Sequence, residues 1–248
     1  MLSTNASHEA HLPRAVQWSA VLFALGFPSA FTWVYFVAFA GDHPVAQHVA
    51  YTAGKVIQFL VPVGWVVLIE RRRLRLSAPT TSGLALGLTM GVLVAAVVVA
   101  TYFGWLAPSG ILIPVAHEVK EKLAAFQIDT PAKMIAMGVF YTLLHSLLEE
   151  YYWRWFAFGQ LRRLVSLPAA IAVSSIAFMG HHAIVLRDYL HYLPWPWAVF
   201  ASASVAIGGA MWAWLYDRSG SIYAPWISHL LIDAAIFVIA FNMVFDLR

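Results

Sequence analysis

The chain has 248 residues, of which 61% are hydrophobic and only 11% are charged. Because a soluble domain carries about 25% charged residues, this composition excludes a soluble globular protein and indicates a single polytopic membrane domain. The net charge is +3, but the basic residues lie mostly in short loops, so we attribute them to helix orientation and expect no nucleic-acid partner. With no cysteine, the chain forms neither a disulfide nor a cysteine-ligated metal site.

Seven segments are each long and apolar enough to cross a bilayer, which takes roughly 20 mostly apolar residues. In chain order they are residues 15–40, 48–70, 80–105, 132–157, 168–188, 195–216 and 222–245. A further segment, IPVAHEVKEKLAAF (113–126), is amphipathic and too charged to cross, so we expect an interfacial or short re-entrant helix there. The sequence therefore predicts an all-α transmembrane bundle of seven to eight helices.

Basic clusters in the loops indicate how the bundle is oriented. The sequences RRRLR (71–75) and RR (162–163) follow the second and fourth spans, and Arg218 follows the sixth. Alternating spans place all three clusters on one side, and an excess of Lys and Arg marks the cytoplasmic side. We therefore expect a multi-pass protein of the bacterial inner membrane with its N-terminus in the cytoplasm.

The fourth span contains three charges in the stretch HSLLEEYYWR. Glu150 and Arg154 are four residues apart, so on an α-helix they share a face and can pair. Glu149 is rotated about 100° from Glu150, and a carboxylate beside a salt bridge but not consumed by it is a candidate general base. The alternative is a structural ion pair that locks two helices together.

The fifth and seventh spans add imidazoles and a third carboxylate. In SSIAFMGHHAI, Phe178 and His182 are four residues apart and share a face, so we expect at most one of His181 and His182 to face a common pocket. In WISHLLIDAAIF, His229 and Asp233 are also four apart. Packing histidines and a His–Asp pair that merely pins the helix are the structural alternatives.

These polar residues lie at a similar depth. At about 1.5 Å per residue, Glu150 is roughly 18 Å along its helix from Arg162, and His229 is roughly 16 Å from Arg218. Ionisable residues within the membrane are expensive and mark functional sites, so we expect an active site in an intramembrane cavity. The set suits hydrolysis, with a glutamate as base and imidazoles that hold water or stabilise an oxyanion. Two imidazoles and a carboxylate could also bind zinc, and both possibilities stay open.

Two further polar residues lie within the spans. Lys55 lies in the second span, and we expect it to snorkel outward or to contact a neighbouring helix. His145 precedes Glu149 by four residues, and we expect it to pack or to orient that glutamate.

Three motifs resemble those of a known family. EEYYWR, FMGHH and HLLID are similar to the EExxxR, FxxxH and HxxxN/D motifs of the CPBP intramembrane proteases, in the same order over residues 149–233. That family includes the eukaryotic CAAX prenyl endopeptidase and bacterial bacteriocin-processing or immunity-linked members. The resemblance implies six catalytic residues: Glu149, Glu150, Arg154, His182, His229 and Asp233.

The resemblance also implies a role for each motif. Glu149 would activate the attacking water with help from His182, the Glu–Arg pair would support it, and the HLLID motif would form the oxyanion site. Position 233 is Asp where many members have Asn, so an ionised side chain there would repel an oxyanion unless it is protonated or paired. Trp155 stands where members usually carry Gly.

The function that follows is an intramembrane endopeptidase that cleaves a membrane-associated or lipidated, CAAX-like substrate with a glutamate-activated water. Zinc is a possible cofactor, and the expected partners are the bilayer and a membrane-bound or prenylated peptide. Residues 1–131 would form N-terminal helices and the interfacial segment, and residues 132–248 the catalytic core of one integrated domain. The alternatives are a proton- or ion-coupled transporter, although the matching broken helices of such a protein are not visible in the sequence, and a silent immunity or scaffold protein.

Overall fold

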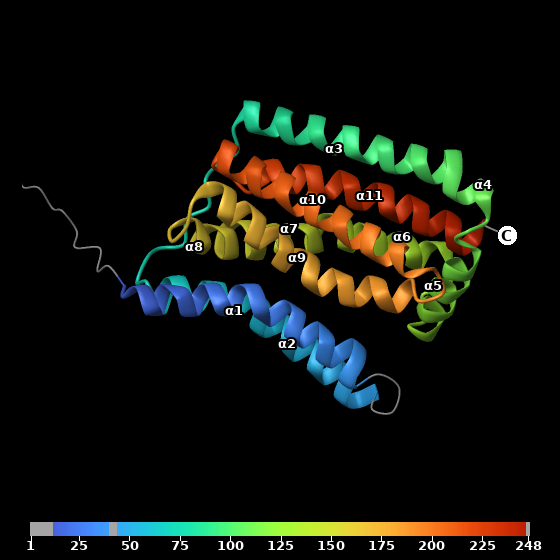
Figure 1. Cartoon of the computed structure of the whole chain (residues 1–248), viewed down its shortest axis with the longest axis horizontal. Coiled ribbons are helices and arrows are strands. Elements are labelled where there is room, and N and C mark those ends of the chain that lie inside the picture. The colour runs from blue at the N-terminus through green and yellow to red at the C-terminus, as the bar shows by residue number, and fades with distance from the viewer. Residues whose placement is uncertain (1–11, 40–43, 247–248) are drawn as a thin grey trace, which may run out of the picture.

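The computed structural model describes residues 12–39 and 44–246, and every regular element within them is a helix (Figure 1). Seven helical runs are long and apolar enough to cross a membrane: Arg14–Ala38, Val45–Ile69, Thr81–Ser109, Pro131–Arg162, Leu167–Tyr189, Trp195–Ser219 and Tyr223–Phe245. The predicted all-α polytopic bundle is therefore confirmed, and the chain is an integral multi-pass membrane protein. Residue 40, the last residue of the predicted first span, lies outside the described residues. So do residues 1–11, the N-terminal part of the chain that was predicted to lie in the cytoplasm.

Several spans are built from more than one helical element. The first two are α1 (Arg14–Trp33) with η1 (Val34–Ala38), and α2 (Pro44–Gly64) with η2 (Trp65–Ile69). The third comprises α3 (Thr81–Thr101), η3 (Tyr102–Leu106) and α4 (Ala107–Ser109). The fourth comprises α6 (Pro131–Val139), η4 (Phe140–His145), α7 (Ser146–Glu150), η5 (Tyr151–Phe158) and α8 (Gly159–Arg162). The last three are α9 (Leu167–Tyr189), α10 (Trp195–Ser219) and α11 (Tyr223–Phe245).

The charged segment between the third and fourth spans is helix α5 (Ile113–Ala125), as expected from its amphipathic sequence. It is not among the helices that are apolar enough to cross the membrane. Lys122 joins it to the end of α9, because its ammonium lies 2.5 Å from Asp188 and 3.0 Å from Glu118. The segment thus packs against the bundle through an ion-paired face.

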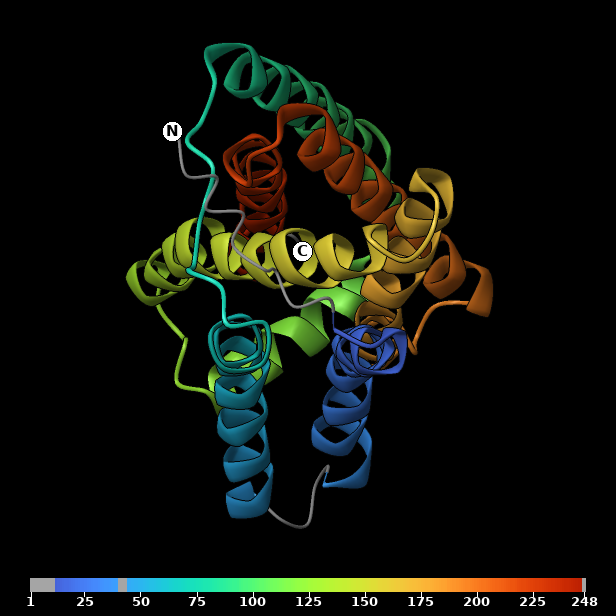
Figure 2. The ribbon, with the colours of Figure 1, turned by 90° about the vertical axis from the view of Figure 1, so that its left-hand side faces the viewer.

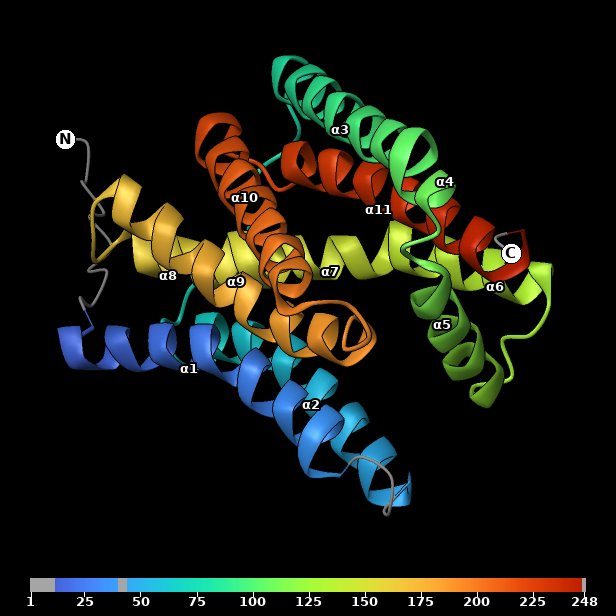
Figure 3. The same cartoon turned by 45° about the vertical axis from the view of Figure 1, so that its right-hand side comes forward.

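The fourth span crosses the middle of the bundle, between α3 and α11 on one side and α1 and α2 on the other (Figures 2 and 3). It is π-helical over η4 and η5, and the short α7 between them carries both glutamates. Single π-helical turns often occur at functional sites, because the wider turn changes which side chains share a face. The central helix therefore departs from regular α geometry on both sides of its charged residues.

Close packing of α3 against α11 holds the last span in place. A Cβ at Gly87 would overlap the carbonyl of Ala224, and one at Gly91 would lie 2.8 Å from the Cα of Ser228. Small residues of this kind let membrane helices approach backbone to backbone. Ser228 precedes His229, so this contact fixes the height at which α11 presents its imidazole.

Candidate active site

The six residues predicted from the motifs lie on the fourth, fifth and seventh spans, and the structure brings them into one cluster. They are Glu149 and Glu150 on α7, Arg154 on η5, His182 on α9, and His229 and Asp233 on α11. Four of them are almost completely inaccessible, with exposed fractions of 4% for Glu149, 0% for Glu150, 2% for Arg154 and 4% for His229. The cluster is therefore a set of ionisable groups that only one another and the surrounding side chains can neutralise.

Glu150 has a charged partner at one oxygen and a hydrogen bond at the other, and Oε2 itself accepts no hydrogen bond within the described residues. The Nε of Arg154 lies 3.2 Å from Oε2, and Nδ1 of His229 donates to Oε1 at 2.7 Å. The two remaining guanidinium nitrogens of Arg154 have no hydrogen-bond acceptor in the described part of the chain. Its guanidinium instead faces the rings of Phe178 and Trp212, at 4.7 and 5.1 Å from their centroids. Glu150 therefore holds a buried cation and an imidazole together.

Glu149 is surrounded by imidazoles without such a bond. Its Oε1 lies 3.8 Å from Nε2 of His181 and 4.0 Å from Nε2 of His145, and its Oε2 lies 3.7 Å from Nε2 of His229. Each of these distances exceeds the range of a hydrogen bond. The two adjacent glutamates thus differ: Glu150 is engaged by its neighbours, whereas the carboxylate of Glu149 can still accept a proton from a molecule placed beside it.

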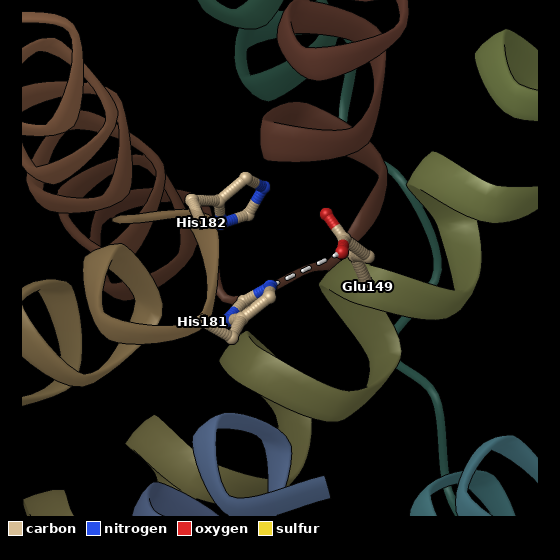
Figure 4. Close-up of side chains that lie close together, drawn as sticks. All are labelled: Glu149, His181 and His182. Atoms are coloured by element: carbon tan, nitrogen blue, oxygen red, sulfur yellow. Dashed lines mark ion pairs between the residues drawn. The ribbon is translucent and has the colours of Figure 1, made fainter. Parts of the chain in front are cut away.

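The expectation that at most one of the adjacent histidines faces the pocket is wrong. His181, His182 and Glu149 each bring one ligand-type atom within 4.8 Å of the others, and Figure 4 shows both rings flanking the carboxylate. Side chains of neighbouring residues leave a helix about 100° apart. Glu149 lies between the directions in which the side chains of His181 and His182 point, so both rings reach it. The indole of Trp153 stacks on His181, with 5.4 Å between centroids and 5° between planes.

Hydrogen bonds fix which nitrogen of two histidines carries the proton. Nδ1 of His182 lies 3.0 Å from the carbonyl oxygen of Phe178, which can only accept, so Nδ1 is the donor. Nδ1 of His229 donates to Glu150 in the same way. In the neutral form of each ring, Nε2 then carries the lone pair. Both imidazoles are therefore oriented by one nitrogen and available for chemistry at the other.

The imidazole of His229 is positioned by further contacts that the motifs do not indicate. Trp212 stacks on it, with 3.9 Å between ring centroids and 18° between planes, and its Nε1–H donates to Ser228 Oγ at 3.2 Å. Asp233 lies one turn further along α11, with Oδ1 3.6 Å from His229 Nε2 and 20% of its side chain exposed. Trp212 is on α10, where the sequence has no charged residue near mid-span, so no local signal could have identified it.

The residues present fit a zinc ion. Glu149, His181 and His182 form the group of possible ligands in the described part of the chain, and two imidazoles with one carboxylate are a donor set typical of catalytic zinc. The outer N–H of His182 is held by a carbonyl, as is usual for a metal-binding histidine. This set contains His181, which is not among the six residues that the motifs predict.

Comparison with known families is consistent with this geometry. Residues 131–235 match the family model described as type II CAAX prenyl endopeptidase, Rce1-like, and this range includes all three motifs. The match confirms the resemblance inferred from those motifs and supports, at the level of family, a CAAX-type intramembrane endopeptidase. No curated protein and no solved structure matches the chain.

Proposed function

We propose that this protein is an intramembrane endopeptidase that hydrolyses a peptide bond of a membrane-associated or lipidated, CAAX-like substrate, with Glu149 as the residue that activates water. The observation that carries the proposal is the contrast between two adjacent buried glutamates. Glu150 binds Arg154 and His229, while Glu149 lies 3.7 to 4.0 Å from three imidazoles and hydrogen-bonds to none of them. Of the two glutamates, Glu149 is therefore the one left to act as a base.

The proposed reaction begins with a water molecule beside Glu149. Its carboxylate takes a proton from the water as the oxygen attacks the scissile carbonyl carbon, and the C=O electron pair moves to the carbonyl oxygen. Collapse of this intermediate breaks the C–N bond, and the proton held by Glu149 passes to the leaving amine. Nε2 of His182, oriented by the bond from Nδ1 to Phe178, accepts a hydrogen bond from the same water.

His229 is placed to stabilise the oxyanion. In its doubly protonated form, Nδ1–H donates to Glu150 while Nε2–H is free to donate to the developing negative charge. Asp233, with Oδ1 3.6 Å from that same Nε2, acts on the oxyanion through the imidazole in this scheme. Such an indirect role accounts for an aspartate at a position where a direct donor would have to be Asn or a protonated Asp.

The same residues also accommodate a metal-dependent version of this activity. Glu149, His181 and His182 would hold zinc, and a bound zinc ion supplies Lewis-acid polarisation of water or of a carbonyl group. In that version His229, held by Glu150 and stacked on Trp212, keeps its place beside the oxyanion.

The test is cleavage of a fluorogenic prenylated peptide by detergent-purified full-length protein. Glu149→Gln and His182→Ala should each abolish cleavage, with general-base loss alone lowering the rate by roughly 10²- to 10⁴-fold. Glu121→Gln is the matched control, because this substitution makes the same chemical change at an exposed residue of α5, outside the cluster. Size-exclusion chromatography must show that every variant remains monodisperse, and activity that survives both site substitutions would refute the assignment.

A further inference from the structure

A lysine inside the membrane-spanning part of the bundle takes no part in the reaction described above. Lys55 lies on α2, and its ammonium is 5.6 Å from the ring centroid of Phe31, 5.9 Å from that of Tyr51 and 5.7 Å from that of Phe59. Within residues 12–39 and 44–246 it forms no ion pair and no hydrogen bond. Of the two expectations for this residue, contact with a neighbouring helix is confirmed, because Phe31 belongs to α1.

The packing of α1 against α2 builds this aromatic surround. A Cβ at position 54 would lie 2.5 Å from Cδ2 of Phe31, so only Gly54 lets that ring rest against the backbone of α2. The ring is thereby held next to the stem of Lys55. Aromatic faces attract a cation, but at nearly 6 Å they do not satisfy the three N–H donors of an ammonium group.

The face of α2 that carries Lys55 packs against the fourth span, which carries the proposed catalytic glutamate. Tyr151, two residues after Glu149, donates a hydrogen bond from its hydroxyl to the carbonyl of Phe59 at 3.1 Å. The ring of Phe59 also lies edge-on to that of Tyr152, with 6.5 Å between centroids, and Lys55 and Phe59 are four residues apart on one face of α2. The cation therefore lies on the face of α2 that packs against the span carrying the proposed catalytic glutamate.

One turn along α2 there is a second polar group without a partner. Gln58 is 1% exposed, and its Oε1 has no hydrogen-bond donor in the described part of the chain. A cation and a carbonyl acceptor on one face of a membrane helix are costly unless something polar binds them. An ammonium pairs best with a carboxylate, and an amide oxygen with a backbone N–H. The end of a peptide chain carries both groups.

We propose that Lys55 binds the free C-terminal carboxylate of the peptide that is cleaved beside Glu149, with Gln58 accepting from a backbone N–H of the same segment. This inference rests on the proposed function and assigns a residue that binds the chain end of its CAAX-like substrate. In a CAAX-type substrate the prenylated cysteine is fourth from the C-terminus. The three residues after it span at most about 10 Å when extended, so the carboxylate must enter the site together with the bond that is cut.

The experiment compares two farnesylated fluorogenic peptides that are identical except for their ends, one a free acid and the other a carboxamide. With wild-type protein we expect kcat/KM to be roughly tenfold or more higher for the acid, mainly through KM, because a charge-assisted hydrogen bond is lost with the amide. Lys55→Met should bring the acid-to-amide ratio close to one, and Lys55→Arg should restore part of the preference. Lys120→Met, at an exposed lysine of α5, should keep the wild-type ratio.

Binding of the same two peptides to the Glu149→Gln variant separates this inference from the proposed function. A preference for the acid that disappears when Lys55→Met is added supports carboxylate recognition whether or not the wild-type protein cleaves. Equal binding of acid and amide overturns the role of Lys55 and leaves the protease proposal standing if both peptides are cut. A Lys55→Met variant that loses acid and amide cleavage to the same extent also overturns it, because recognition of a carboxylate cannot affect the amide.

Discussion

The clearest test of how the two glutamates divide their roles is a comparison of Glu149→Gln with Glu150→Gln. The substitutions are isosteric, adjacent in sequence and both buried, so they differ only in the surroundings of the carboxylate. Glu150 neutralises the guanidinium of Arg154, which is 2% exposed, and accepts the hydrogen bond of His229. We expect Glu150→Gln to destabilise the fold and Glu149→Gln to leave it intact.

The magnitude follows from what each change leaves behind. Removing one partner of a buried ion pair costs about 3–5 kcal/mol, because the other charge stays buried and uncompensated. Glutamine can still accept from His229, so we take the lower end, about 3 kcal/mol. For a chain of this size each kcal/mol lowers Tm by roughly 2–4 °C, which gives a fall of about 6–12 °C. The carboxylate of Glu149 lies 3.7 to 4.0 Å from its imidazole neighbours and makes no hydrogen bond to any described residue, so its replacement should shift Tm by less than about 4 °C.

The assay is thermal unfolding in detergent followed by intrinsic fluorescence, for which the 11 tryptophans of the chain give ample signal. Two of them, Trp153 and Trp212, stack on histidines of the cluster and report on it directly. A fall in Tm for Glu149→Gln as large as that for Glu150→Gln would show that both glutamates are structural. An unchanged Tm for Glu150→Gln would show that Arg154 does not depend on it, and either result would refute the reasoning.

Three further outcomes are expected. Asp233→Asn should leave cleavage close to wild type or raise it, since Asp233 acts through the imidazole, whereas a complete loss would make it a metal ligand or an obligatory partner. If zinc is required, purified protein should contain it in stoichiometric amount and a chelator should abolish cleavage. His181→Ala should then lower the metal content. Metal-free protein that cleaves its substrate through Glu149 would exclude the zinc-dependent mechanism. The ammonium of Lys122 holds the pKa of Glu118 below its usual value. The ion pair therefore stabilises α5 at neutral pH and is lost as the pH falls through that lowered pKa. The hydrogen-exchange protection factors of α5, which are corrected for the intrinsic slowing of exchange in acid, should therefore fall at low pH, and Lys122→Met should remove this pH dependence.

The sequence alone predicted the membrane spans, because burial in lipid imposes a composition on every segment that crosses it. The seven predicted segments agree with the helices found, and helix α5 stands where charge and amphipathicity predicted it. The contact between Glu150 and Arg154 could also be predicted from the sequence, since residues four apart on a helix are neighbours independently of the tertiary structure. Local spacing and composition are sufficient for features of this kind.

The tertiary structure decided how the motifs meet. The bond between His229 and Glu150 joins residues 79 positions apart. From the sequence, Asp233, one turn away on the same helix, would be expected to be the closer partner of that imidazole, but it lies at 3.6 Å and Glu150 at 2.7 Å. The convergence of His181 and His182 on Glu149 was predicted wrongly, because the direction of a side chain from its own helix does not say where the neighbouring helix places its target.

The aromatic residues and the lysine beside the site show the same limit. Trp212 stacks on His229 from α10, and Lys55 lies among aromatic rings on α2, two spans before the glutamates. Their roles depend on how helices cross, which is set by packing between segments distant in sequence and by the π-helical turns on either side of α7. The lipid around a membrane helix requires an apolar local sequence, so the helix can be predicted from that sequence alone. An active site shared among four helices forms only once those helices are packed together.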